Sequence, residues 1–78
     1  SYQAMLSGKT IEVECYLTSR MTVKALLVDS KGCLCKSVSK NCDDGSRFYV
    51  DCNSLPMGQY ILYLEVNGKK YSKNFLIK

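Results

Sequence analysis

Alternation of apolar and polar residues with a period of two constrains this chain more than any other feature of its sequence. Over residues 11–17, Ile11, Val13 and Cys15 share one side of an extended segment, whereas Glu12 and Glu14 share the other. The same pattern recurs along most of the chain, and no stretch sustains the 3.6-residue period of an amphipathic helix. We therefore predict an all-β protein built from half-buried strands.

The alternating segments predict six strands, and a seventh if residues 2–6 also pair. The six are expected at residues 11–17, 21–29, 33–39, 48–52, 60–66 and 69–77. Residues 40–45 are polar and end in Asp44-Gly45, so we expect a loop there. Short strands separated by turn signals at this spacing are typical of an antiparallel sandwich or barrel.

Three short segments carry the residue types that reverse turns require. An aspartate caps the first turn and a glycine closes it, whereas a proline fixes φ near the start of the second turn and a glycine ends it. The third segment is an Asn-Gly pair, a strong hairpin signal because both central residues of a type I′ turn need positive φ. These positions are Asp29 and Gly32, Pro56 and Gly58, and Asn67 and Gly68.

The size and composition of the chain predict one globular domain, residues 1–78. The 78 residues are 46% hydrophobic and 23% charged, and a chain this short buries only about 60% of its unfolded surface, which leaves little room for a second core. No segment approaches the ~20 apolar residues of a membrane-spanning helix. The net charge is +4, and its lysines gather near the C-terminal end, where we expect a solvated edge strand and not a nucleic-acid site.

The residue types that catalysis and cofactor binding need are missing or misplaced. There is no histidine, which removes the commonest general base and the nucleophile pairs that depend on it. Asp43 and Asp44 are adjacent in a loop, whereas paired catalytic carboxylates flank a cleft. The glycines are explained by turns and none opens a phosphate-binding helix. We expect no catalytic residues, no cofactor and no metal.

Five cysteines in 78 residues suggest an exported, partly cross-linked protein, and the odd number leaves one thiol without an intramolecular partner. Cys33 and Cys35 lie two residues apart on a strand, where their Cβ atoms are too far apart to bridge easily, so each is a better partner for Cys42 or for a neighbouring strand. Cys15 and Cys52 lie on apolar faces, either as buried thiols or as a bridge across the core. Two bridges among five cysteines leave fifteen connectivities, and these stay open.

Binding through a sheet edge is the functional candidate that the strand pattern favours. An exposed edge accepts a partner's strand through main-chain hydrogen bonds, and alternate side chains then select the partner. Lys73 shares a face with Tyr71, Phe75 and Ile77, so we expect a bulge or an exposed start in the last strand. The candidate edge or surface contacts are Tyr16, Tyr49, Ile61, Tyr63, Lys69 and Lys73.

Residues 22–78 resemble a known bacterial pattern. It comprises the turn at Asp29–Gly32, the Leu-Pro-x-Gly-x-Tyr segment at residues 55–60, and the lysine-rich final strand that follows Asn67-Gly68. The segment is similar to the C-terminal sorting domains of type IX secretion substrates, and to small free-standing secreted Ig-like proteins of gut bacteria that have no assigned function. The sorting domains do not usually hold five cysteines.

The resemblance implies an Ig-like antiparallel β-sandwich of six or seven strands that is exported to the periplasm, the cell surface or the medium. The leading hypothesis is a non-catalytic module that binds a protein or a surface. The alternatives are a secretion or sorting signal cut from a larger protein, and a thiol oxidoreductase that uses Cys33 and Cys35. The ligand, the disulfide connectivity and the oligomeric state do not follow from the sequence.

Overall fold

The computed structural model describes residues 1–78 and contains seven strands and no helix. The strands are β1 (Tyr2–Ser7), β2 (Thr10–Cys15), β3 (Met21–Asp29), β4 (Leu34–Cys42), β5 (Arg47–Asp51), β6 (Gly58–Val66) and β7 (Lys69–Ile77). Every pairing is antiparallel. The predicted all-β sandwich is confirmed, and the seventh strand is β1. With no helix, the chain offers no helical segment that could cross a membrane.

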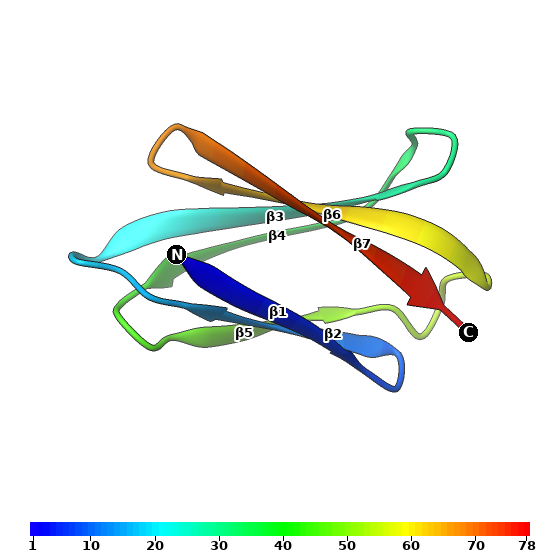
Figure 1. The fold of residues 1–78 in the computed structure, drawn as a ribbon, viewed down its shortest axis with the longest axis horizontal. Helices are drawn as coiled ribbons and strands as arrows, with labels where there is room; N and C mark the ends of the chain where they lie inside the picture. The colour runs from blue at the N-terminus through cyan, green and yellow to red at the C-terminus, as the bar shows by residue number, and fades with distance from the viewer.

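The strands form two stacked sheets, one of three strands in the order β1-β2-β5 and one of four in the order β4-β3-β6-β7 (Figure 1). Consecutive hairpins build most of each sheet, and the chain changes sheet between β2 and β3, between β4 and β5, and between β5 and β6. The two termini lie toward opposite ends of the long axis of the sandwich (Figure 1).

The core lies between the sheets and is entirely apolar. Sixteen side chains are buried, and none of them is polar or charged. They come from the inward positions of both sheets and include Ile11 and Val13 of β2, Leu27 of β3 and Leu64 of β6. Burial of alternate residues is what the period-two pattern demands, because successive side chains of a strand point to opposite faces.

The fourth strand differs most from its expected form. The loop predicted from residue 40 was wrong for residues 40–42, because β4 continues to Cys42 along β3. Asn41 lies opposite Thr22 and accepts a hydrogen bond from its hydroxyl (2.7 Å), and Cys42 is fully buried. Polar residues are stable here because β4 is an edge strand whose outer face meets water. The pairing with β3 also shifts between Leu27 and Val28, which leaves Cys35 as a bulge.

Two of the expected turn segments form tight reversals. The Asp29 carboxylate accepts the backbone N–H groups of Lys31 and Cys33, both at 2.9 Å. Asn67 and Gly68 have φ of 50° and 80°, as a type I′ turn requires. Ahead of β6, the hydrogen-bonded turn runs from Cys52 to Leu55, whose N–H donates to the Cys52 carbonyl (3.1 Å). The segment after this turn is held by a hydrogen bond that the Tyr60 hydroxyl donates to the Pro56 carbonyl (2.6 Å).

Lysine side chains close both open sides of the sandwich. On one side, Lys73 of β7 donates to the Ala4 carbonyl of β1 (2.6 Å) and lies 5.5 Å from the centre of the Phe75 ring. On the other side, Lys40 of β4 donates to the Arg47 carbonyl of β5 (3.3 Å). Of the two forms expected for the last strand, the exposed start is confirmed: residues 69–74 are exposed or half-buried, and β6 and β7 pair without the bulge. The ammonium group avoids burial by reaching across the seam to a main-chain acceptor.

Replacing Lys73 with methionine should destabilise the protein by about 1–2 kcal/mol, because a charge-assisted hydrogen bond to the Ala4 carbonyl is lost from a partly buried seam. Urea unfolding followed by circular dichroism measures the change. Lys70→Met is the matched control on the same strand: Lys70 is 3.9 Å from Glu65 and largely exposed, so its loss should cost no more than about 0.5 kcal/mol. Equal effects of the two variants would contradict a structural role for Lys73.

Candidate functional site

The outer face of the three-stranded sheet presents a regular grid of side chains. Register places Met5, Glu12 and Tyr49 in one row across β1, β2 and β5. Its neighbouring rows are Gln3, Glu14 and Arg47, and Ser7, Thr10 and Asp51. We call these nine residues the acidic face.

The central row of the acidic face forms a slot with a carboxylate at its base. Met5 and Tyr49 are 55% and 57% exposed, although both are large and apolar. Neighbouring antiparallel strands lie about 5 Å apart, so these two side chains stand roughly 10 Å apart with Glu12 between them. Together with Ser7 and Thr10 they line a hollow of about 310 Å³. The slot therefore combines apolar walls, an acidic base and hydroxyl groups at one end.

The charge of the acidic face is opposite to that of the whole molecule. It holds three of the seven carboxylates of the protein but only one of its eleven basic residues, Arg47. Arg47 is already paired with Glu14 (3.6 Å), whereas Glu12 takes part in none of the three ion pairs. Hydrogen bonds from the backbone and side chain of Asn53 lower the pKa of Asp51, so that carboxylate stays charged. The face thus carries unpaired negative charge on a basic protein.

The surface residues expected from the sequence do not form a single patch. Tyr49 belongs to the acidic face, and Tyr16 lies beside it, its hydroxyl donating to the Gln3 side chain (3.3 Å). Ile61 and Tyr63 belong to β6 and lie on the outer face of the other sheet, opposite Val28 and Leu26. The two pairs are therefore on opposite sides of the sandwich.

The two candidate lysines lie in different settings. Lys73 points into the seam between the sheets, whereas Lys69 is exposed and lines a hollow of about 200 Å³ at the end of the sandwich that holds the N-terminus.

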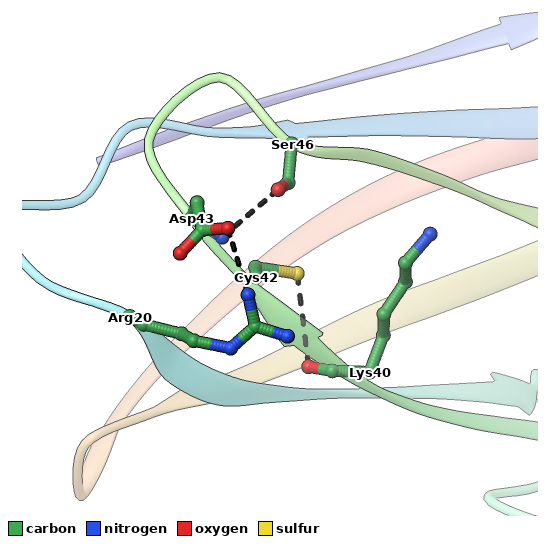
Figure 2. Close-up of polar contacts among 5 residues, drawn as sticks. All are labelled: Arg20, Lys40, Cys42, Asp43 and Ser46. Carbon is green, nitrogen blue, oxygen red and sulfur yellow. Dashed lines mark hydrogen bonds and ion pairs between the residues drawn. The ribbon is translucent and has the colours of Figure 1, made fainter.

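Carboxylates fasten the loops at that end of the sandwich instead of forming an acid–base pair. Asp43 forms an ion pair with Arg20 (2.8 Å), and its backbone N–H donates to the Ser46 hydroxyl (2.9 Å), as Figure 2 shows. Asp44 accepts the N–H of Leu17 (3.0 Å). Both carboxylates thus bind the loop between β2 and β3, Asp43 at Arg20 and Asp44 at Leu17.

The five cysteines are distributed between the two ends of the sandwich, all as free thiols. Cys33 is exposed in the turn before β4, and Cys35 is half-buried in the bulge, its thiol donating to the Cys33 carbonyl (3.5 Å). No helix terminus adjoins them, as reactive thiol pairs usually require. Cys15, Cys42 and Cys52 are buried in the core. Nowhere do three or more His, Cys, Asp or Glu side chains gather as a metal site would need.

Burial makes two of the core thiols poor nucleophiles. It is the main cause that raises the pKa of Cys15 from 9.0 to about 11, with further contributions from the charge and the hydrogen bond of Cys42. Burial likewise raises the pKa of Cys52. Thiolates, not thiols, react, so these cysteines are inert in the folded state near neutral pH.

Sequence reasoning missed the central row, although part of its signal was present. Glu12 is the polar member of an alternating strand, and alternation does not say which strands become its neighbours. Met5 carries no local signal, because the sequence of residues 2–6 does not show which strand that segment pairs with. The row exists only once β1 and β5 are both placed beside β2.

Raising the pH should weaken the reduced protein through Cys15. An unfolded Cys15 thiol ionises near pH 9, its ordinary value, whereas the folded thiol stays neutral up to about pH 11. The stabilisation is therefore complete below about pH 9 and is lost as the pH rises toward 11. We expect the free energy of unfolding to fall by roughly 2 kcal/mol over this range because of Cys15 alone. Urea titrations with a phosphine reductant, compared between wild type and Cys15→Ala, measure the difference.

Cys33→Ser is the control for this measurement, because its thiol is exposed and the variant should keep the full pH dependence. Identical pH profiles for wild type and Cys15→Ala would show that the buried thiol does not contribute.

Comparison with known proteins supports the fold. No family model matches the chain, and no curated protein matches it. Among solved structures, it is similar to a DUF3244 family protein with an immunoglobulin-like β-sandwich fold from Bacteroides vulgatus ATCC 8482, with a TM-score of 0.84. The match covers 99% of this chain and 83% of that chain at 11% sequence identity. Similarity at that identity shows the fold alone: the chain is an immunoglobulin-like β-sandwich.

Proposed function

We propose that this chain is a non-catalytic, exported Ig-like module that binds a protein partner through its acidic face, by taking a basic side chain of the partner into the slot of Met5, Glu12 and Tyr49. The observation that carries the proposal is the register of β1, β2 and β5, which sets an unpaired carboxylate between two exposed apolar side chains.

A cationic side chain with an apolar stem fits this slot best. Its charge pairs with Glu12, while its methylene groups pack against Met5. A guanidinium group also stacks on a tyrosine face, here Tyr49, so arginine is favoured over lysine. Tyrosine and arginine are frequent anchors of protein interfaces, which is why we place a protein in the slot. The negative charge of the acidic face would steer a basic segment toward it.

The lysines of the seams are the reason for choosing this face over an edge of the three-stranded sheet. A partner strand that docks on β1 or β5 needs free main-chain groups on that edge. Lys73 already occupies the Ala4 carbonyl of β1, and Lys40 occupies the Arg47 carbonyl of β5. Docking on either edge would have to displace a charged donor, whereas the acidic face is open.

Export is supported by the cysteine content and by the resemblance to secreted Ig-like proteins of bacteria. Five cysteines in 78 residues are typical of proteins that fold outside the cytoplasm. Fractionation of cells that produce the protein, followed by antibody detection, should find it in the periplasm, on the surface or in the medium. Recovery with a cytoplasmic marker would contradict export.

A blocked arginine tripeptide, acetyl-Gly-Arg-Gly-amide, should bind weakly at the slot. In a titration of ¹⁵N-labelled protein followed by NMR, we expect the largest shifts at the amides around Met5, Glu12 and Tyr49. Glu12→Gln should weaken binding about tenfold, and Tyr49→Ser about fivefold, because each loses roughly 1 kcal/mol of charge pairing or stacking. The matched glutamate tripeptide should give no shifts on this face.

Tyr63→Ser is the matched control variant, because Tyr63 lies on the opposite outer face and its loss should leave binding unchanged. Shifts spread evenly over the surface, or centred on β3 and β6, would overturn the proposal. So would equal responses to the arginine and glutamate peptides.

A further inference from the structure

Two buried cysteines face one another at one end of the sandwich. Cys15 is the last residue of β2 and Cys42 is the last residue of β4, so they belong to different sheets. Their side chains are 1% and 0% exposed. Five residues after Cys42 the chain has crossed from one sheet to the other and begins β5 at Arg47. The sheets must therefore lie close together where these cysteines sit.

Backbone hydrogen bonds fix the spacing between the two strand ends. The Cys15 N–H donates to the Ser46 carbonyl (2.9 Å), and the Cys15 carbonyl accepts the N–H of Gly45 (2.8 Å). Gly45 follows Cys42 by only three residues, and the intervening turn is closed because the Ser46 N–H donates to the Asp43 carbonyl (3.1 Å). Both backbone groups of Cys15, its N–H and its carbonyl, are thus hydrogen-bonded to the turn that follows Cys42.

Side-chain contacts complete the arrangement. The Cys42 thiol lies close enough to the Cys15 thiol to contribute to its raised pKa. The Cys42 thiol also lies 3.6 Å from the Lys40 carbonyl, to which it donates (Figure 2). The salt bridge of Arg20 with Asp43 lies immediately beyond it and holds the turn in place (Figure 2). Both side chains are buried in the core at this end of the sandwich.

We propose that Cys15 and Cys42 form a disulfide that joins the two sheets when the protein folds in an oxidising compartment. The structure then represents the reduced form, and this inference concerns the interior only, so it is independent of the acidic face.

The oxidation needs a disulfide-bearing oxidant, either a small-molecule disulfide or an oxidised thiol oxidoreductase. One cysteine, as its thiolate, attacks the oxidant and releases one thiol. The second thiolate then displaces the remaining oxidant thiol and closes the Cys15–Cys42 bond. Two protons and two electrons leave the pair, and the oxidant departs as two thiols. Because both folded thiols are buried, and burial raises the pKa of Cys15, the exchange takes place before this end of the sandwich closes, or while it is transiently open.

The other three cysteines of the chain lie away from Cys15 and Cys42. Cys33, Cys35 and Cys52 lie at the opposite end of the sandwich, where the turns after β3 and β5 are found (Figure 1). Cys33 is exposed and Cys35 lies in a bulge. In antibody domains the inter-sheet bridge joins the second and sixth strands, but β6 contains no cysteine. A bridge between β2 and β4 would also join the two sheets, with β4 taking the place of the sixth strand.

Refolding in a mixture of reduced and oxidised glutathione, followed by tryptic mapping, tests the proposal on the wild-type chain. Cleavage after lysine and arginine puts Cys15 in residues 10–20, Cys42 in 41–47, Cys52 in 48–69, and Cys33 with Cys35 in 32–36. We expect the peptide 10–20 linked to 41–47, two hydrogens lighter than the sum of the reduced peptides. Recovery of 10–20 as a free thiol, or its linkage to any other peptide, would overturn the proposal.

Thermal unfolding supplies an independent check. The oxidised wild type should melt about 10 °C or more above its reduced form, because the bridge closes a long loop of the unfolded chain. Cys33→Ser should keep this difference, whereas Cys42→Ala should lose it. If Cys42→Ala does not fold, the peptide map of the wild type still decides the pairing. A Cys33→Ser variant without the oxidation-dependent rise would contradict the assignment.

Discussion

Mutual burial of two apolar sheet faces is the constraint on which the rest of this structure depends. Only the facing sheet covers the apolar inner face of each sheet. The inward residues of β2 and β5 therefore pack against those of β3, β6 and β7. All sixteen buried side chains are apolar, so specificity in the core comes from shape and from the pattern of alternation. Polar interactions lie at the edges and ends of the sandwich, where lysines, aspartates and hydrogen bonds in the turns hold the two sheets together.

Alternation predicts strands well because burying the polar face of a strand costs much free energy. Turn residues locate most strand ends. Asn67 and Gly68, for example, adopt the left-handed conformation that their types favour. Alternation does not predict an edge strand whose outer face is exposed to solvent. Residues 40–42 looked like loop for that reason, yet their main chain pairs with β3. Local sequence also could not show that Lys73 would reach another sheet, because its acceptor is the carbonyl of Ala4, 69 positions away.

The candidate binding site was harder to predict than the fold because it depends on strand order. Tyr16, Tyr49, Ile61 and Tyr63 are all outward-facing tyrosines or isoleucine, and nothing local assigns them to opposite sheets. The buried thiols show the same limit. Cys15 and Cys42 are far apart in sequence, and their meeting follows from the place at which the chain crosses between layers. The similarity of fold at 11% identity fits this picture, because many apolar residues satisfy the same alternating pattern.

The position of the two chain ends has a mechanical consequence. The termini lie toward opposite ends of the long axis, at the outer ends of β1 and β7 (Figure 1). A pull applied to both would run along these strands and would load their ladders with β2 and β6 in shear. All hydrogen bonds of a ladder then resist together, instead of opening one after another from an end. Lys73 and the Tyr2–Tyr71 ring contact, with centroids 5.3 Å apart, tie the same two strands across the seam. The sandwich is therefore arranged to bear tension along its length.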